Sequence, residues 1–272
     1  GKTSALRLAE AGAHVLLVAR SAEKLEETAQ EIATLGGIAT IYQADVSDLE
    51  DCDRLVAEVL KNHEFIDILL NNAGRSIRRS LELSYDRFHD FERTMQINYF
   101  GAVRLTMGLL PSMSERGTGH IINMSSISAL TPSPRFSAYV ASKSALDAWT
   151  RAAAVEYSDR NVRFTTINMP LVRTPMIEAT SVYDSMPVLT PDEAGDMVVE
   201  AVIKKPKRIA SPLGVYLQVM TAVAPKFTEI VMNVVFRMFN DSAAARGDNK
   251  PEKVEASNEQ VALAALMKGV HF

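Results

Sequence analysis

Short apolar runs alternate along this chain with longer segments in which apolar residues recur every three or four positions. Runs of the first kind predict buried strands, and segments of the second kind predict amphipathic helices. The predicted strands cover residues 14–19, 39–43, 66–70, 119–124, 162–167 and 208–210. The predicted helices cover residues 3–11, 22–35, 48–63, 85–113, 139–157 and 192–203. This alternation is typical of an α/β fold, a doubly wound parallel sheet with helices on both faces.

Four polar side chains within this pattern point to chemistry: Tyr139, Lys143, Ser126 and Asn98. Tyr139 and Lys143 are four residues apart, so they share one helix face. A free phenol titrates near ~10, and a nearby ammonium lowers that pKa. Tyr139 would then serve as general acid or base on a carbonyl or alcohol oxygen. Ser126 would hydrogen-bond that oxygen, and Asn98 would order a water that relays protons to Lys143. These groups predict hydride transfer beside a nicotinamide ring.

Each of these residues alone also has a structural explanation, because most helical tyrosines are packing residues and serines are common. Their setting favours the functional interpretation. Ser126 follows a predicted strand, and Tyr139 opens a long predicted helix. Doubly wound folds place their sites at the carboxyl ends of strands.

Several motifs, in their order and spacing, resemble those of the short-chain dehydrogenase/reductases over nearly the whole chain. The motifs are Asn71-Asn72-Ala73-Gly74, Asn98-Tyr99-Phe100-Gly101, Asn123-Met124-Ser125-Ser126 and Tyr139…Lys143. The resemblance implies that Asn98, Ser126, Tyr139 and Lys143 form a catalytic tetrad. It also implies the residues that contact the cofactor. These are Asn72, Ala73 and Gly74 along it, Tyr139 and Lys143 at the nicotinamide ribose, and Asp45 and Val46 near the adenine.

The chain departs from the family first at its beginning. The family starts with a strand and the glycine-rich turn TGxxxGxG, whereas Gly1-Lys2-Thr3 resembles the last glycine of that turn entering its helix. We therefore expect the first, central strand to be missing from these residues, and the chain to be a fragment of a longer protein. Gly1 would still contact the cofactor. We expect weak cofactor binding by the chain alone, because the missing glycines would place N–H groups on the pyrophosphate.

The second departure lies after the strand at 162–167. The family usually has Pro-Gly there, and this chain has Pro170-Leu171. Glycine permits backbone angles that leucine does not. We therefore expect this loop to take a different path, and the resemblance implies cofactor contacts from Pro170, Val172 and Thr174.

The strand at 14–19 ends in alanine and is followed by Arg20 and Ser21. NAD-selective relatives usually carry an acidic residue at this point to bind the ribose hydroxyls. A guanidinium suits a 2′-phosphate, although a lone arginine is usually a solvated surface residue. Because the acidic residue is also absent, we favour NADP(H) over NAD(H), with Arg20 and Ser21 at the phosphate.

The composition of the chain limits which other classes of protein it can belong to. The chain has 272 residues, 47% of them hydrophobic, which is enough for one substantial core. The net charge of −4 gives no reason to expect a nucleic-acid partner. A single cysteine, Cys52, excludes a disulfide framework within the chain and suits the cytoplasm. We see no signal peptide and predict no metal site.

A compact reductase domain could end near Ala210, and about sixty residues follow it. Segments 213–224 and 227–239 are strongly apolar, but each is shorter than the ~20 residues that span a bilayer. They would pack on the core or on a partner subunit, line a pocket for a long acyl chain, or lie in a membrane interface. Segment 242–259 is polar and predicted to be mobile, with a short helix at 261–267. We assign residues 1–210 to a Rossmann-type reductase domain and 211–272 to its C-terminal helical extension and tail.

Segments 74–80, 169–176 and 241–247 are similar to the reductase domain of bacterial fatty acyl-CoA reductases. That resemblance implies NADPH-dependent reduction of a long-chain acyl-CoA thioester to the aldehyde. Arg78, Arg79 and Arg173 would contact phosphates of CoA, unless they are solvated surface charges.

Two alternatives stay open: a dehydrogenase of another hydrophobic alcohol or ketone, and a non-catalytic NADP-binding scaffold. The family also implies a homodimer or homotetramer paired through the helices at 85–113 and 139–157. A lipid substrate would suit a cytoplasmic protein with peripheral contact to a membrane.

Overall fold

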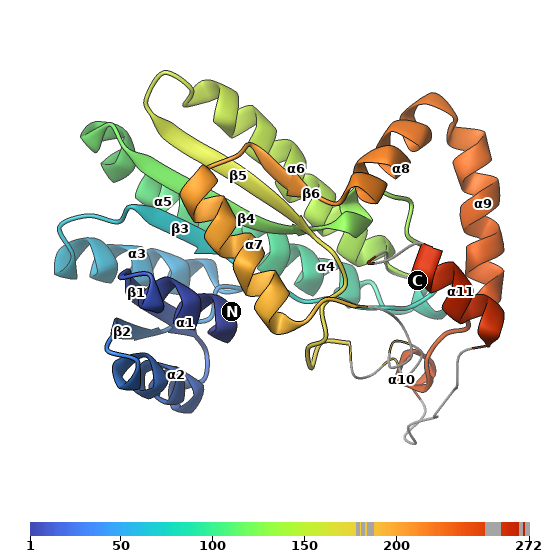
Figure 1. Ribbon diagram of the computed structural model, residues 1–272, viewed down its shortest axis with the longest axis horizontal. Helices are drawn as coiled ribbons and strands as arrows, with labels where there is room; N and C mark the ends of the chain where they lie inside the picture. Colours follow the sequence, from blue (N-terminus) through green and yellow to red (C-terminus); the bar gives the residue numbers. More distant parts are fainter. Residues whose placement is uncertain (178–179, 181–182, 184–187, 248–256, 267–268, 270–272) are drawn as a thin grey trace.

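The computed structural model describes residues 1–177, 180, 183, 188–247, 257–266 and 269. Strands and helices alternate through the first 210 residues (Figure 1). The strands are β1 (His14–Ala19), β2 (Ile38–Gln43), β3 (Ile68–Asn71), β4 (Gly119–Ser126), β5 (Val162–Met169) and β6 (Arg208–Ala210). The helices are α1 (Lys2–Glu10), α2 (Ala22–Thr34), α3 (Leu49–Asn62), α4 (His89–Met95), α5 (Gly101–Arg116), α6 (Ser137–Glu156) and α7 (Pro191–Lys204).

All strand pairs are parallel and form two sheets. One has the order β3-β4-β5-β6, and the other contains β1 and β2. Among the described residues no strand joins β1 to β3. The prediction of a doubly wound parallel α/β fold is confirmed.

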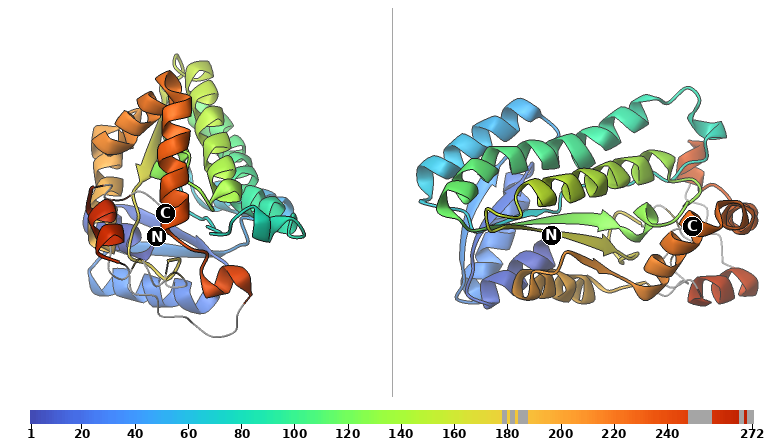
Figure 2. Two further views of the ribbon diagram at one scale, coloured as in Figure 1. Left: turned by 90° about the vertical axis from the view of Figure 1, so that its right-hand side faces the viewer. Right: turned by 90° about the horizontal axis from the view of Figure 1, so that it is seen from above.

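Helices cover both faces of the strands (Figure 2). Helices α3, α5 and α6 lie on one face, and α1 and α7 lie on the other. Neighbouring residues of β4 explain why both faces are needed. Ile121 packs with Met113 of α5, while Ile122 packs with Val198 of α7, and both isoleucines are fully buried. A strand covered on both sides carries apolar residues at consecutive positions, as Ile121 and Ile122 show here.

The prediction of a single helix over residues 85–113 is wrong in detail. A 3-10 turn, η1 (Glu82–Ser84), precedes α4, and a π-helical turn, η2 (Gln96–Phe100), separates α4 from α5. A π turn admits one extra residue without ending the helix, so the apolar pattern continues and gives little warning of it. Such turns are frequent at functional sites, and this one carries Asn98.

The C-terminal extension begins with α8 (Pro212–Val223) and α9 (Pro225–Met238), which project beyond the carboxyl ends of the strands (Figure 1). Met232 and Phe239 are buried together with Ile127 and Leu171. The extension therefore shares a hydrophobic cluster with the segments that directly follow β4 and β5. No helix in the described part of the chain is long and apolar enough to cross a membrane.

The segment after α9 contains a short helix that the sequence analysis did not predict. Residues Ala243–Arg246 form α10, with Ala243 and Ala245 buried, and the mobility predicted for 242–259 stays a prediction. Residues 248–256 lie outside the described part of the chain. The helix predicted at 261–267 corresponds to α11 (Asn258–Leu266), and Met267 also lies outside the described residues.

Candidate functional site

The four predicted catalytic residues come from three elements. Asn98 lies in the π turn η2, Ser126 is the last residue of β4, and Tyr139 and Lys143 occupy the first two turns of α6. All four are almost completely buried, from 1% exposed for Asn98 and Ser126 to 7% for Tyr139. The structure brings them together, since Tyr139 and Lys143 line one cavity and Ser126 hydrogen-bonds Tyr139.

Burial decides the protonation state of Tyr139. Loss of solvent raises its pKa, the Ser126 hydrogen bond lowers it, and the charge of Asp147 raises it. The net direction is upward, opposite to the lowering that the sequence analysis expected from Lys143. Tyr139 is therefore a neutral phenol at neutral pH, which suits a proton donor to a developing oxyanion.

Lys143 is held at the end of β4. Its Nζ donates a hydrogen bond to the Met124 carbonyl at 2.7 Å, and 4% of the residue is exposed. Burial lowers the pKa of the ammonium to about 8, while the negative charge of Asp147 acts in the opposite direction. A lysine with this pKa changes charge close to physiological pH.

Asn98 is fixed by three hydrogen bonds. Its Oδ1 accepts from the Arg75 N–H at 2.8 Å, and its Nδ2 donates to the Arg75 carbonyl at 2.8 Å and to Ser142 Oγ at 2.9 Å. Gly74 allows this close approach of the loop. A Cβ at Gly74 would lie 3.0 Å from Asn98 Oδ1 and 3.4 Å from Lys143 Nζ. The loop after β3 is therefore held against the tetrad.

A cavity of about 160 Å³ is lined by most of the residues that the sequence analysis expects near the nicotinamide end of the cofactor. Its lining includes Asn72, Gly74, Tyr139, Lys143, Pro170, Val172 and Thr174. Ala73 lies in the same loop, and Gly1 is adjacent, since a Cβ there would be 2.9 Å from Asn72 Nδ2. Leu171 replaces the family glycine and is buried in the cluster that contains Ile127. This side chain therefore links the cavity wall to the C-terminal extension.

The residues expected near the adenine lie apart from this cavity, at the ends of β1 and β2. Arg20 forms an exposed ion pair with Asp45 at 3.8 Å, and Ser21 caps α2. Hydrogen bonds from Ser47 lower the pKa of Asp45. The Val46 carbonyl fits against Gly101, where a Cβ would come within 1.9 Å of its oxygen. A glycine is therefore required at position 101.

Asp147 is a site residue that the sequence analysis missed. It lies one turn after Lys143 on α6, is 7% exposed, and accepts a hydrogen bond from Asn168 Nδ2 at 3.1 Å. Asn168 Nδ2 also approaches the Ser126 carbonyl at 3.3 Å. Burial raises the pKa of Asp147, although Ser125, Asn168 and the nearby cations oppose this. The sequence did hold one signal for Asp147: it lies four residues after Lys143, which places both side chains on the same face of a helix.

Among the described residues, no group of three or more His, Cys, Asp or Glu side chains is placed to hold a metal ion. The site has polar and cationic groups around a cavity, with a phenol, a hydroxyl and a buried ammonium. That arrangement can stabilise negative charge on an oxygen atom and deliver a proton to it.

Comparison with known proteins agrees with this geometry. The family described as short chain dehydrogenase matches residues 1–183. A fatty acyl-CoA reductase of Acinetobacter baylyi is 50% identical over 272 residues, covering 100% of this chain and 91% of the relative. A fatty acyl-CoA reductase of Mycobacterium tuberculosis is 45% identical over 219 residues, covering 80% of this chain and 74% of the relative.

A solved structure agrees as well. A metagenomic short-chain oxidoreductase in complex with NADP is 27% identical, with a TM-score of 0.67 over 78% of this chain and 90% of that one. The chain belongs to the short-chain dehydrogenase family.

Replacement of Asp147 by Asn should move the alkaline limit of activity. The substitution removes a negative charge that stabilises the Lys143 ammonium, so the pKa of Lys143 should fall below about 8. The charged form exists below that pKa, and activity that needs it would be lost at a lower pH than in the unmodified protein. The measurement is kcat/KM for nicotinamide-cofactor oxidation between pH 6 and pH 9.

Asp53→Asn is the matched control, because Asp53 is a half-exposed acid paired with Arg104 on the surface. Its profile should not move. An unchanged alkaline limit in Asp147→Asn would contradict the electrostatic role of Asp147.

Proposed function

We propose that this member of the short-chain dehydrogenase family is an NADPH-dependent reductase of a lipid carbonyl. Long-chain fatty acyl-CoA is its substrate and the fatty aldehyde its product. The observation that carries the reductase chemistry is the buried Tyr139, hydrogen-bonded to Ser126 in the cavity that Lys143 also lines. The identity of the substrate is supported by the whole-chain similarity to a fatty acyl-CoA reductase.

The residues around the cavity fit the nicotinamide end of the cofactor. Gly74 leaves a hollow that a Cβ would fill, and Asn72, Lys143 and Thr174 offer polar atoms around it. Lys143 would hold the ribose, while Pro170 and Val172 would flank the ring. Bound NADPH would supply the hydride.

The chain's own side chains would act on the thioester oxygen. As the carbonyl carbon becomes tetrahedral, Ser126 and Tyr139 would donate hydrogen bonds to the oxyanion, and Tyr139 would protonate it to the hemithioacetal. Lys143 would stabilise the resulting phenolate until a proton is regained through Asn98 and its ordered water. The hemithioacetal then breaks its C–S bond, which releases CoA thiol and the aldehyde.

The C-terminal extension supports a long apolar substrate. An apolar cleft of about 280 Å³ lies between α8, α9 and the segment at 132–134. Met232 lines this cleft and also packs in the cluster with Leu171, which lines the cavity of the site. One hydrophobic cluster therefore borders both the cleft and the catalytic cavity, and an acyl chain would lie along it.

The same helices support peripheral contact with a membrane. Their outer sides expose Tyr216, Val219, Val223, Phe227, Ile230 and Val234. Residues 204–239 carry six basic side chains and one acidic side chain, a surplus of five positive charges in a chain of net charge −4. Apolar side chains beside a basic surplus suit an anionic lipid surface. Pairing of two copies stays a prediction.

The first test is NADPH oxidation by the full-length protein with a long-chain acyl-CoA. Tyr139→Phe should lower kcat by about 10²-fold or more, because the proton donor is lost. Tyr157→Phe, at the other end of the same helix, should leave kcat unchanged. Release of free CoA thiol should equal NADPH consumption. Activity with a fatty ketone or alcohol alone would instead make the protein a dehydrogenase of another hydrophobic substrate.

Cofactor preference depends on Arg20. Arg20→Ala should raise the KM for NADPH about 10-fold, because a charge-assisted contact to the 2′-phosphate is lost. The KM for NADH in the same variant is the internal control and should not change. Equal use of both cofactors by the unmodified protein would refute the preference.

Membrane contact can be measured by co-flotation with vesicles that contain anionic phospholipid. The full-length protein should float, and the double substitution Phe227→Ser and Ile230→Ser should reduce its bound fraction several-fold. Phe88→Ser is the matched control, because Phe88 is 70% exposed but lies outside the extension. Equal flotation of all three proteins would rule out α9 as the contact.

A further inference from the structure

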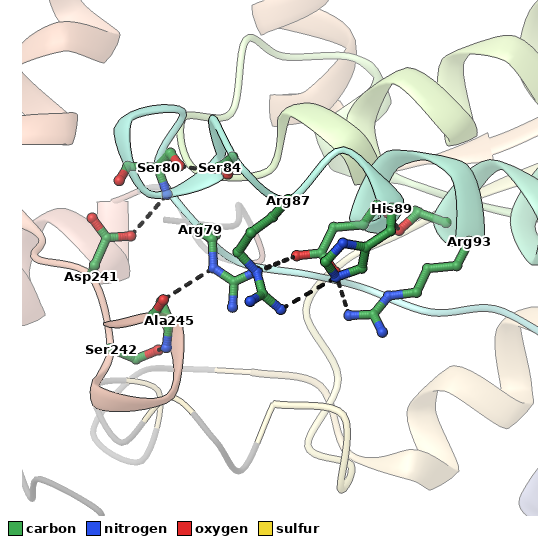
Figure 3. Close-up of polar contacts among 11 residues, drawn as sticks. Arg79, Ser80, Ser84, Arg87, His89, Arg93, Asp241, Ser242 and Ala245 are labelled. Atoms are coloured by element: carbon green, nitrogen blue, oxygen red, sulfur yellow. Dashed lines mark hydrogen bonds and ion pairs between the residues drawn. The ribbon is translucent and has the colours of Figure 1, made fainter. Parts of the chain in front are cut away.

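A cluster of basic side chains surrounds a single carboxylate at the start of α4 (Figure 3). Asp90 is 2% exposed and forms ion pairs with Arg79, Arg87 and Arg93. The Arg87 Nε is 3.2 Å from its carboxylate, and His89 Nε2 is 3.4 Å away. Burial alone would raise the pKa of Asp90, but the Arg87 hydrogen bond and the charges of Arg93 and Arg79 outweigh it.

Arg79, the most buried of the three arginines, stabilises the fold. The Arg79 side chain is only 12% exposed, and besides Asp90 it donates to the Ala245 carbonyl of α10 at 3.0 Å. The neighbouring Ser80 N–H donates to Asp241 Oδ1 at 2.9 Å. Arg78 donates to the Asn240 carbonyl at 2.8 Å. Arg78 and Arg79 therefore anchor the C-terminal extension, which corrects the expectation that Arg79 reaches a CoA phosphate.

The outer two arginines, Arg87 and Arg93, have no acid other than Asp90 within ion-pair distance among the described residues. Arg79 is sufficient to neutralise Asp90, yet Arg87 and Arg93 share the same carboxylate. Their side chains are 38% and 47% exposed, and within the described structure neither forms an ion pair with another acid. Asp86 and Glu92 are exposed in the same stretch but form no ion pair with these arginines in the described part of the chain. Two guanidinium groups with unused donors at the surface are suited to a phosphate.

The cluster is also connected to the catalytic cavity from two directions. The loop that lines the cavity at Gly74 and Arg75 continues directly to Arg79. Helix α4 leads from Asp90 into the π turn that carries Asn98, eight residues later, or about 12 Å at 1.5 Å per residue. In an acyl-CoA, the pantetheine arm separates the thioester from the phosphates, so the phosphates must bind away from the tetrad.

We infer that Arg87 and Arg93 bind phosphate groups at the nucleotide end of the acyl-CoA substrate. This inference rests on the proposed function. The bound phosphates would take up the donors that Asp90 leaves unused, while Arg79 keeps the carboxylate neutralised. His89 lies beside Arg87, with 3.5 Å between its Nε2 and the Arg87 guanidinium, and borders the same surface.

The test uses the double variant R87Q/R93Q, which keeps Arg79 on Asp90. Binding of adenosine 3′,5′-bisphosphate, measured by calorimetry, should weaken at least 10-fold. The KM for a long-chain acyl-CoA should rise by a similar factor. The KM for the matching acyl thioester of N-acetylcysteamine, which has no phosphate, should stay unchanged. R104Q is the matched control, because Arg104 is 47% exposed and paired with Asp53 on a different surface.

The outcomes separate this site from the proposed function. Bisphosphate binding that is lost in the double variant supports the site even if acyl-CoA is not reduced, in which case the proposed function fails alone. Reduction of acyl-CoA with an unchanged KM in the double variant overturns the site alone. Equal losses with both thioesters, or a lowered Tm that tracks the loss, would assign the arginines to the fold and overturn the inference.

Discussion

The parallel pairing of β4 with β5 is the constraint on which the site depends. The two strands pair over their full length, from Gly119 opposite Val162 to Ser126 opposite Met169. Parallel neighbours cannot be joined by a tight turn, so the chain must cross over through a helix. That helix is α6, and its first turns come to the carboxyl end of β4. The crossover is thus what places Tyr139 and Lys143 beside Ser126.

Burial at that strand end then sets the chemistry. Loss of solvent disfavours the charged form of every group, so it raises the pKa of Tyr139 and lowers that of Lys143 to about 8. The two residues do not become a phenolate and an ammonium simply because they are adjacent. Asp147 partly offsets the loss for Lys143, and it does so from the next turn of the same helix. A neutral phenol can donate a proton to an oxygen atom on which negative charge develops.

The C-terminal extension is tied to this core by both apolar and polar contacts. Phe239 and Met232 pack with Leu171, while Arg79 links Asp90 to α10. The loop after β5 and the segment after β3 are therefore both tied to the extension.

Local features of the sequence were sufficient for the fold class and for most strands and helices, and they predicted that the four tetrad residues would lie close together. Apolar periodicity reports which face of an element is buried, and the spacing of Tyr139 and Lys143 places them on one helix face whatever surrounds them. The π turn at Asn98, the burial of Asp147 and the contact of Arg79 with Ala245, 166 residues later, were decided only by the tertiary structure. The upward shift of the Tyr139 pKa was also decided only by the tertiary structure. Each depends on which distant segments exclude solvent or supply a partner, and that information is not carried by neighbouring residues in the chain.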